Sequence, residues 1–136
     1  MLLTLEIIES KLINNLAAVK DKINYLREKG IKISLDDFGT GYSSLQYLKT
    51  LTIDEIKIDR SFISNWTNSH ADMAILSTIT QMAKSLGLPT VAEGIETQEQ
   101  LDILTGLGCN YGQGYLCNKA MPVNHLMAFL ESCHAA

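Results

Sequence analysis

The sequence has no long apolar run and few prolines, cysteines and basic residues, and each shortage excludes a class of protein. Its apolar runs are only a few residues long, far below the ~20 residues of a transmembrane helix. Two prolines and nine glycines in 136 residues exclude a collagen-like or low-complexity chain. Three cysteines without a CxxC pair favour reduced thiols over a disulfide scaffold. Because no secretory signal follows Met1, we expect a cytoplasmic location.

The charge balance limits the partners. Eleven Lys and Arg residues against fifteen Asp and Glu residues give a net charge of −4. Without a basic run, the chain is a poor candidate for binding duplex nucleic acid, and an anionic substrate would need divalent cations beside it. The length of 136 residues and the 46% hydrophobic content predict a single globular domain over residues 1–136.

Short apolar segments with strand character alternate five times with segments of helical periodicity. This alternation predicts an α/β protein with parallel strands and right-handed crossovers, in an open doubly wound sheet or in a barrel. A full eight-stranded barrel takes about 250 residues, so we expect a TIM-barrel-like partial barrel of about five β/α units. The expected strands are 2–8, 31–35, 53–58, 88–92 and 109–111, and the expected helices are 12–26, 45–49, 75–86, 98–104 and 122–133.

Three of the helices carry clear signals. In the third, Ile75, Ile79, Met82 and Leu86 are expected to form one apolar stripe. Thr97 and Gln100 predict a capping box for the fourth helix. Pro122 is suited to the first turn of the last helix.

Polar side chains fall where the expected strands end. In a parallel barrel these strand ends meet at one rim, which is where such enzymes hold their chemistry. The residues concerned are Glu6, Asp36, Asp37, Lys57, Asp59, Glu93, Glu96 and Gln113.

A cluster of carboxylates repels itself unless a cation compensates the charge. Oxygen ligands without a Cys/His cluster favour Mg²⁺, Mn²⁺ or Ca²⁺ over zinc or copper. A lysine at the same rim can hold a water molecule or neutralise a phosphate. Carboxylates, metal and lysine together suggest phosphoester hydrolysis by a two-metal arrangement.

Five segments together resemble the EAL family of cyclic-di-GMP phosphodiesterases. Any one of them alone would be a weak signal, but their order along essentially the whole chain makes the likeness specific. The segments are Leu5-Glu6-Ile7-Ile8-Glu9-Ser10, Asp36-Asp37-Phe38-Gly39-Thr40-Gly41-Tyr42-Ser43-Ser44-Leu45, Ile56-Lys57-Ile58-Asp59-Arg60-Ser61-Phe62-Ile63, Val91-Ala92-Glu93-Gly94-Ile95-Glu96 and Gly112-Gln113-Gly114-Tyr115.

The resemblance implies a reaction and a role for each matched residue. The reaction opens cyclic-di-GMP to the linear dinucleotide pGpG in bacterial second-messenger signalling, with two Mg²⁺ or Mn²⁺ ions. Its implied metal ligands are Glu6, Asp36, Asp37 and Glu93, with Asp36 bridging the two ions. Lys57 is implied to activate the hydrolytic water, and Glu93 is counted with it among the catalytic residues. The implied substrate or loop residues are Glu9, which anchors the loop from Asp37 to Ser44, and Asp59, Glu96 and Gln113.

The family's Glu-Ala-Leu motif, a substrate-binding arginine and an asparagine ligand lie in strands that precede the first one here. We therefore expect the 136 residues alone to hydrolyse cyclic-di-GMP poorly or not at all. The implied partners are cyclic-di-GMP and either the missing amino-terminal half of the barrel or a second copy, since an open sheet exposes strand edges. The alternative is a non-catalytic module that binds a nucleotide or a protein.

Simpler explanations exist for single residues. Glu6 could be a surface charge on an edge strand, and Asp36-Asp37 could be an ordinary turn. A strand lysine such as Lys57 usually faces solvent, unless helices cover the outside of a barrel. Arg60 could pair with Asp59 at the surface instead of serving a site.

Overall fold

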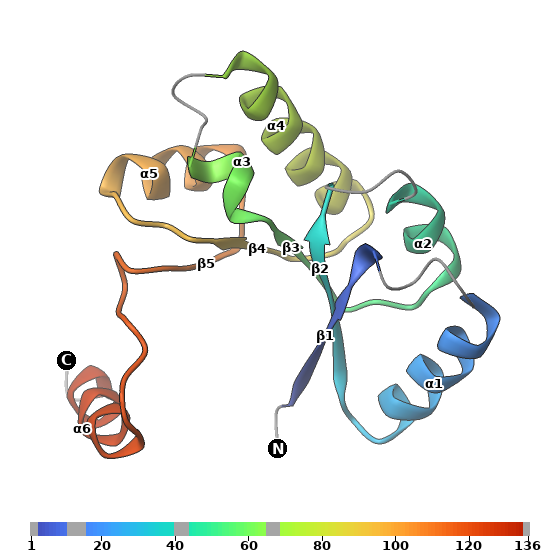
Figure 1. Cartoon of the computed structure of the whole chain (residues 1–136), viewed down its shortest axis with the longest axis horizontal. Coiled ribbons are helices and arrows are strands. Elements are labelled where there is room, and N and C mark those ends of the chain that lie inside the picture. Colours follow the sequence, from blue (N-terminus) through green and yellow to red (C-terminus); the bar gives the residue numbers. More distant parts are fainter. Residues whose placement is uncertain (1–2, 11–15, 40–43, 65–68, 135–136) are drawn as a thin grey trace.

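The computed structural model describes residues 3–10, 16–39, 44–64 and 69–134. Within them, one parallel sheet has the strand order β1-β2-β3-β4-β5, so each strand lies beside the next one along the chain (Figure 1). This confirms the predicted α/β fold with five β/α units. The strands are β1 Thr4–Ile8, β2 Lys32–Phe38, β3 Glu55–Ile58, β4 Thr90–Glu93 and β5 Tyr111–Gln113.

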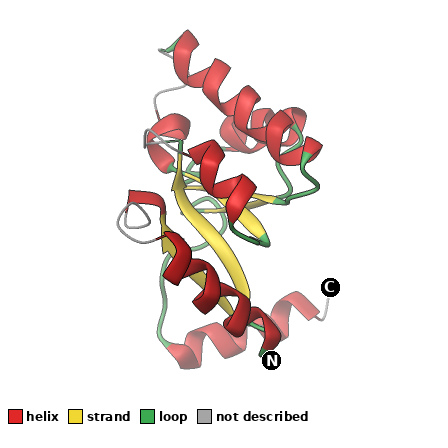
Figure 2. Cartoon of the chain, turned by 90° about the vertical axis from the view of Figure 1, so that its right-hand side faces the viewer, coloured by secondary structure: helices red, strands yellow, loops and turns green. Residues whose placement is uncertain are grey.

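Helices follow every strand. In Figure 1, α1, α2, α4 and α5 form an arc around the sheet, whereas α6 is set apart at the lower left. Figure 2 shows the strands twisting through the middle of the molecule between these helices. None of the described helices is long and apolar enough to cross a membrane. The helices are α1 Leu16–Glu28, α2 Ser44–Thr50, α3 Arg60–Ser64, α4 His70–Ser85, α5 Gln98–Leu107 and α6 Val123–His134.

The core lies between the sheet and the helices. Ile33 and Leu35 of β2 and Ile56 and Ile58 of β3 are fully buried, and Ala92 of β4 continues the layer. Since side chains alternate along a strand, the residues between these positions point to the other face of the sheet. That other face carries the polar side chains of the site.

Helix α4 packs through a different stripe from the one expected. Its buried residues are Leu76, Ile79, Thr80 and Ala83. Thr80 is accommodated there because its hydroxyl donates to the carbonyl of Leu76 at 2.9 Å. Of the predicted stripe, Ile79 is buried and Met82 packs against the core, whereas Ile75 and Leu86 are exposed, so the stripe is right in its middle and wrong at its ends.

Local capping sets the ends of two helices. Ser69 accepts the backbone N–H of Asp72 at the start of α4. The capping box that Thr97 and Gln100 predict for α5 is confirmed, with both reciprocal hydrogen bonds present. Helix α5 runs on to Leu107, beyond the expected end at residue 104, because Gly108 supplies the left-handed C-cap at φ 87°.

The structure corrects two expected strand boundaries and adds one helix. Strand β2 continues through Asp36 and Asp37 to Phe38, so these two acids lie within a strand and not in a loop after it. Strand β5 spans Tyr111–Gln113 instead of 109–111, because Val91 to Glu93 of β4 pair with those residues. The short helix α3 was not predicted from the sequence. The expected helix start at 12 lies outside the described residues.

At the amino end of the sheet, away from the polar rim, one ion pair ties three elements together. The Arg27 guanidinium at the end of α1 donates to Asp54 through two nitrogens, at 2.7 and 3.1 Å. Asp54, just before β3, also accepts the backbone N–H of Ile33 in β2 at 2.9 Å. These hydrogen bonds lower the pKa of Asp54 below its ordinary value, with the Arg27 guanidinium as the main cause.

Candidate active site

Lys57 is the centre of the polar rim. It lies between Ile56 and Ile58 on β3 and points to the face opposite these two core residues. Its side chain is only 5% exposed, and its Nζ atom donates to Oε1 of Glu6 at 2.7 Å. Oε1 of Glu93 forms a second, close ion pair with it, and Oδ1 of Asp36 lies 3.7 Å away.

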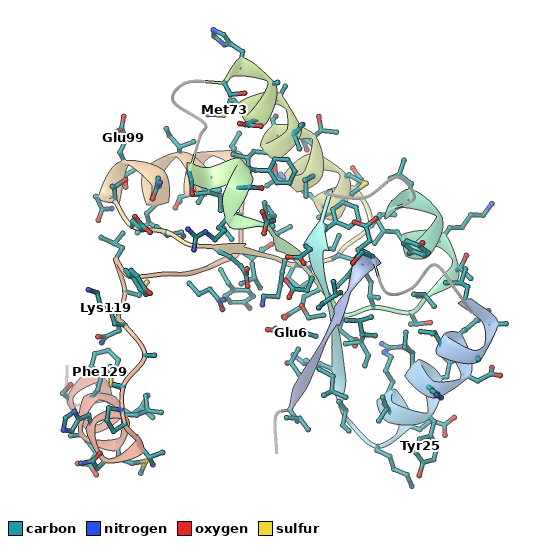
Figure 3. All side chains as sticks on the ribbon, viewed as in Figure 1. Glu6, Tyr25, Met73, Glu99, Lys119 and Phe129 are labelled. Carbon is teal, nitrogen blue, oxygen red and sulfur yellow. The ribbon has the colours of Figure 1, made fainter. Side chains whose placement is uncertain are left out.

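The parallel register explains why these four side chains meet. Glu6 comes from β1, Asp36 from β2 and Glu93 from β4, and β3 supplies the lysine between them. Lys57 pairs with Val91, which places Glu93 two residues farther toward the rim. Glu6 extends from β1 on the side away from α1 (Figure 3), and half of its side chain is exposed. The structure thus brings four of the predicted site residues to one point.

The charges at this point compensate one another. Burial of Lys57 by itself lowers the pKa of its ammonium, but hydrogen bonds to Glu6 and Glu93 and the charge of Asp36 outweigh that effect. The pKa of Lys57 is therefore raised above its ordinary value. Lys57 is a cation at all physiological pH values and holds the carboxylates in place.

Asp37 lies beside this cluster in an unusual backbone conformation. Its φ is +57°, in the left-handed region that few non-glycine residues occupy, and the β2/β3 register shifts between Leu35 and Phe38. Its backbone N–H donates to Oδ1 of Asp36 at 3.0 Å. The bulge turns the side chain of Asp37 out of the regular alternation, toward Asp59.

The environment of Asp37 disfavours its negative charge. Burial is the main cause of a raised pKa at Asp37, and the charges of Asp36, Asp59 and Glu93 add to it. A hydrogen bond with Asp59 acts in the same direction. Asp59 in turn accepts the backbone N–H of Ser61 at 2.8 Å and so holds the first turn of α3. The surroundings of Asp37 thus favour the neutral form of its carboxyl group over the charged form.

Glu9 lies behind the rim and is 2% exposed. Its Oε2 atom accepts the backbone N–H of Gly39 at 3.3 Å, just after β2. Residues 40–43 of the loop that Glu9 is expected to anchor lie outside the described residues. The contact at Gly39 is compatible with that role.

A cleft of about 350 Å³ adjoins the cluster at the ends of β4 and β5. Gln113 connects the cleft with the Lys57 cluster, because its Nε2 atom donates to Oε1 of Glu93 at 2.9 Å. Glu96, predicted for the substrate pocket, is among the lining residues. The lining residues are Arg60, Glu93, Gly94, Glu96, Gln113, Gly114, Tyr115 and Asn118.

Close backbone contacts explain the glycines of this cleft. A Cβ at Gly94, where φ is +72°, would lie 2.7 Å from Cβ of Arg60. A Cβ at Gly114 would lie 2.2 Å from the carbonyl oxygen of Ile95. Only glycine lets these segments approach closely enough to close the cleft wall.

The structure adds residues that sequence reasoning left open or missed. Arg60 lines the cleft, and Asp59 accepts the backbone N–H of Ser61 in the first turn of α3. A surface ion pair between Asp59 and Arg60 is therefore not needed to explain either residue. Tyr115 and Asn118 line the cleft as well. Lys119 lies over the ring of Tyr115, with Nζ 5.3 Å from its centroid. Tyr115 belongs to the matched segment Gly112-Gln113-Gly114-Tyr115, in which it was given no role, and Asn118 and Lys119 follow that segment closely.

The carboxylates of the cluster are the kind of ligand that a hard divalent cation prefers. Their positions, however, are not arranged around a cation. Glu6, Asp36 and Glu93 offer only carboxylate oxygens, which Mg²⁺ and Mn²⁺ accept. In the described part of the chain, no group of three or more His, Cys, Asp or Glu side chains is placed to hold a metal ion. The Lys57 ammonium stands at the point where the carboxylates converge.

A curved parallel sheet with acids and a lysine at its carboxyl rim defines a TIM-barrel-like α/β protein. The EAL domain family matches residues 2–120, and the chain belongs to this family. It is 46% identical over 126 residues to the bifunctional diguanylate cyclase/cyclic di-GMP phosphodiesterase MucR of Pseudomonas aeruginosa, covering 93% of this chain and 18% of MucR. The chain thus spans less than a fifth of that relative.

Solved structures show the same fold. The structure of the PaMucR phosphodiesterase with c-di-GMP superposes with a TM-score of 0.86 at 46% identity, covering 90% of this chain and 50% of that one. The EAL domain of Mycobacterium smegmatis DcpA gives a TM-score of 0.88 at 35% identity, over 95% of this chain and 58% of that one. The structure of Klebsiella pneumoniae BlrP1 with manganese and c-di-GMP gives a TM-score of 0.77 at 33% identity, over 83% of this chain and 29% of that one.

Proposed function

We propose that residues 1–136 form the carboxyl-terminal part of a metal-dependent phosphodiesterase that hydrolyses cyclic-di-GMP to pGpG. The observation that supports this most is the convergence of Glu6, Asp36 and Glu93 on Lys57. It agrees with the 46% identity to MucR, whose solved structure contains c-di-GMP.

The metal ligands in this proposal are Glu6, Asp36, Asp37 and Glu93. Bound Mg²⁺ or Mn²⁺ would lower the pKa of a water molecule and stabilise the charge on the phosphodiester. BlrP1 contains manganese, which favours this pair of metals over zinc. Asp36 would hold the metal through its carboxylate, whose Oδ1 lies 3.7 Å from Nζ of Lys57 and accepts the backbone N–H of Asp37.

The chain's own residues hold the reacting groups in place. Lys57 positions the attacking water and neutralises charge next to Glu93. Gln113 orients Glu93 from the neighbouring strand. Arg60 and Glu96, on the wall of the cleft, contact the substrate beyond the scissile phosphate. Glu9 fixes the backbone that follows the two aspartates.

The chain by itself is proposed to be poorly active. Glu6 is half exposed, and the carboxylates in the described part of the chain are not grouped around a metal position, which supports a site that is completed by further ligands. The alternative, a non-catalytic module that binds the nucleotide or a protein, is supported by the same observation.

A chimera tests the proposal. In it, this chain replaces the matching half of the MucR phosphodiesterase domain, and pGpG formation with Mn²⁺ is followed by chromatography. We expect turnover by the chimera, little by the chain alone, and a loss of at least about 10²-fold with Lys57→Ala. A folded chimera that binds cyclic-di-GMP without cleaving it would support the non-catalytic alternative. Full activity of the short chain would contradict the proposed incompleteness.

A further inference from the structure

Ser34 of β2 carries a buried hydroxyl group that has no hydrogen-bond partner. The residue is 0% exposed. In the described part of the chain, its Oγ atom is the one buried side-chain nitrogen or oxygen that lacks a partner. A hydroxyl group that is removed from water without forming a hydrogen bond destabilises the folded protein. Such groups are rare in native structures, and each one therefore needs an explanation.

The hydroxyl group faces the site and not the apolar core. Ile33 and Leu35, on either side of Ser34, belong to the core. Because side chains alternate along a strand, Ser34 points to the opposite face, which carries the polar side chains of the site. The register pairs Ser34 with Glu6 of β1 and with Glu55 of β3. One row across three strands therefore holds a carboxylate, a hydroxyl group and a second carboxylate.

Of these two neighbours, Glu6 is the one that belongs to the site. Its Oε1 atom accepts from Nζ of Lys57 at 2.7 Å, and this contact reaches over β2, the strand of Ser34. Within the described residues, no group donates to Oε2 of Glu6. Neighbouring strands lie about 4.8 Å apart, a distance that a glutamate side chain can span. Glu55, in contrast, is not among the carboxylates that contact Lys57.

Lys57 holds Glu6 in a position that a metal ligand cannot keep. The ammonium group lies where the carboxylates converge, so Glu6 must give up its contact with Nζ in order to bind a cation there. A half-exposed carboxylate that loses this partner needs another hydrogen bond to fix its direction, as ligating carboxylates generally do. Ser34 is the hydroxyl donor that the strand register places beside it.

We propose that Ser34 is a positioning residue for Glu6 when Glu6 acts as a metal ligand. The Ser34 hydroxyl group donates to one carboxylate oxygen of Glu6 and leaves the other oxygen for the divalent cation. While Lys57 holds Glu6, the hydroxyl group has no partner, which is the kind of local mismatch that proteins retain at functional sites. The inference rests on the proposed metal role of Glu6 but not on the hydrolysis of any substrate.

Two variants that each remove one buried hydroxyl group test this role. Ser34→Ala removes the group without a partner, whereas Thr80→Val, the matched control on α4, removes one that donates to the carbonyl of Leu76. In urea denaturation of the chain with a chelator present, we expect Ser34→Ala to keep or raise the midpoint and Thr80→Val to lower it. A clear fall of the midpoint with Ser34→Ala would overturn the proposal, because its hydroxyl group would then already have a partner.

Binding of Mn²⁺ is the readout that a purely structural residue would not change. It is followed in the MucR chimera, without substrate, by the loss of the electron paramagnetic resonance signal of free Mn²⁺. We expect Ser34→Ala to weaken binding at least about tenfold and Thr80→Val to leave it unchanged. Equal affinities of the Ser34→Ala and unsubstituted chimeras would overturn the proposal, as would failure of the unsubstituted chimera to bind Mn²⁺.

A crystal structure of the chimera with Mn²⁺ tests the contact directly. We expect Oγ of Ser34 to lie within about 3 Å of a carboxylate oxygen of Glu6. A Ser34 hydroxyl group that donates to Glu55 instead, or that still has no partner, would overturn the proposal.

Metal binding and hydrolysis are separate readouts. A chimera whose Mn²⁺ affinity depends on Ser34 but that forms no pGpG would contradict the phosphodiesterase proposal and support the role of Ser34. A chimera that forms pGpG and binds Mn²⁺ equally well with and without the Ser34 hydroxyl group would contradict the role of Ser34 alone.

Discussion

The side-chain nitrogen of Lys57 lies 2.7 Å from Oε1 of Glu6, although 51 residues separate them in the chain. One residue belongs to β3 and the other to β1, and β2 runs between these strands. Both side chains therefore reach over the middle strand on the same face of the sheet. The Lys57 ammonium thus compensates carboxylates that would otherwise repel one another.

Removal of this cation should destabilise the protein. Lys57→Met retains the length of the side chain but leaves Glu6, Asp36 and Glu93 without their common partner. We expect a loss of roughly 2–3 kcal/mol in the free energy of unfolding, less than the roughly 3–5 kcal/mol for breaking a fully buried ion pair, because Glu6 is half exposed. Urea denaturation without metal measures it. Lys49→Met, at an exposed position on α2, serves as the control and should change little.

Asp37→Asn should stabilise the metal-free protein. The raised pKa of Asp37 shows that its negative charge is unfavourable there, through burial and the charges of Asp36 and Asp59. Asparagine removes the charge and tolerates the φ of +57°. We expect a gain of about 1 kcal/mol at pH 7 by urea denaturation.

The pH dependence has a definite sign. The pKa of Asp37 is higher in the folded protein than in the unfolded chain. The protonated carboxyl group therefore stabilises the fold at pH values below the pKa of the unfolded chain, and this stabilisation is lost as the pH rises through the pKa of the folded protein. The gain in the free energy of unfolding that Asp37→Asn gives over the unsubstituted protein should therefore grow as the pH rises and vanish in acid. Asp21→Asn, at an exposed position on α1, should have no such profile. A loss of stability at pH 7 with Asp37→Asn would contradict the assignment.

Gly94→Ala should disrupt the cleft wall. Its φ of +72° disfavours any side chain, and the new Cβ would lie 2.7 Å from Cβ of Arg60. We expect a loss of about 1–3 kcal/mol by thermal unfolding. Gly106→Ala is the matched control, since it lies within α5 with nothing near its Cβ position. That substitution should stabilise by about 0.5–1 kcal/mol, and similar effects of the two would disprove the steric argument.

The Arg27 and Asp54 pair should make stability depend on acid pH. Because Arg27 lowers the pKa of Asp54, the pair contributes stability above the unfolded pKa of an aspartate and loses it as pH falls through the lower folded pKa. Asp54→Asn should cost about 1–2 kcal/mol at pH 7 and little in strong acid. Denaturation at several pH values measures this, and a constant difference across them would exclude the ionic contribution.

Local patterns in the chain predicted most of the fold. The alternation of strands and helices and the capping box at Thr97 are short-range signals, and the structure agrees with them. The boundaries that were wrong depend on distant partners. Asp36 remains in β2 because it pairs with Ile8 of β1, and Asp37 remains there because the pairing with β3 resumes at Phe38. The buried face of α4 follows α3, α5 and β3, on which the helix packs.

The sequence by itself determined which chemical groups this protein has and that parallel strands would bring them to one rim, because strand periodicity and carboxylate chemistry are properties of short segments. Only the tertiary structure decided that Lys57 contacts three carboxylates, that Asp37 leaves the alternation at a bulge, and that Tyr115 lines the cleft beside Arg60. These relationships depend on hydrogen-bond register between strands far apart in the chain, which no local pattern encodes.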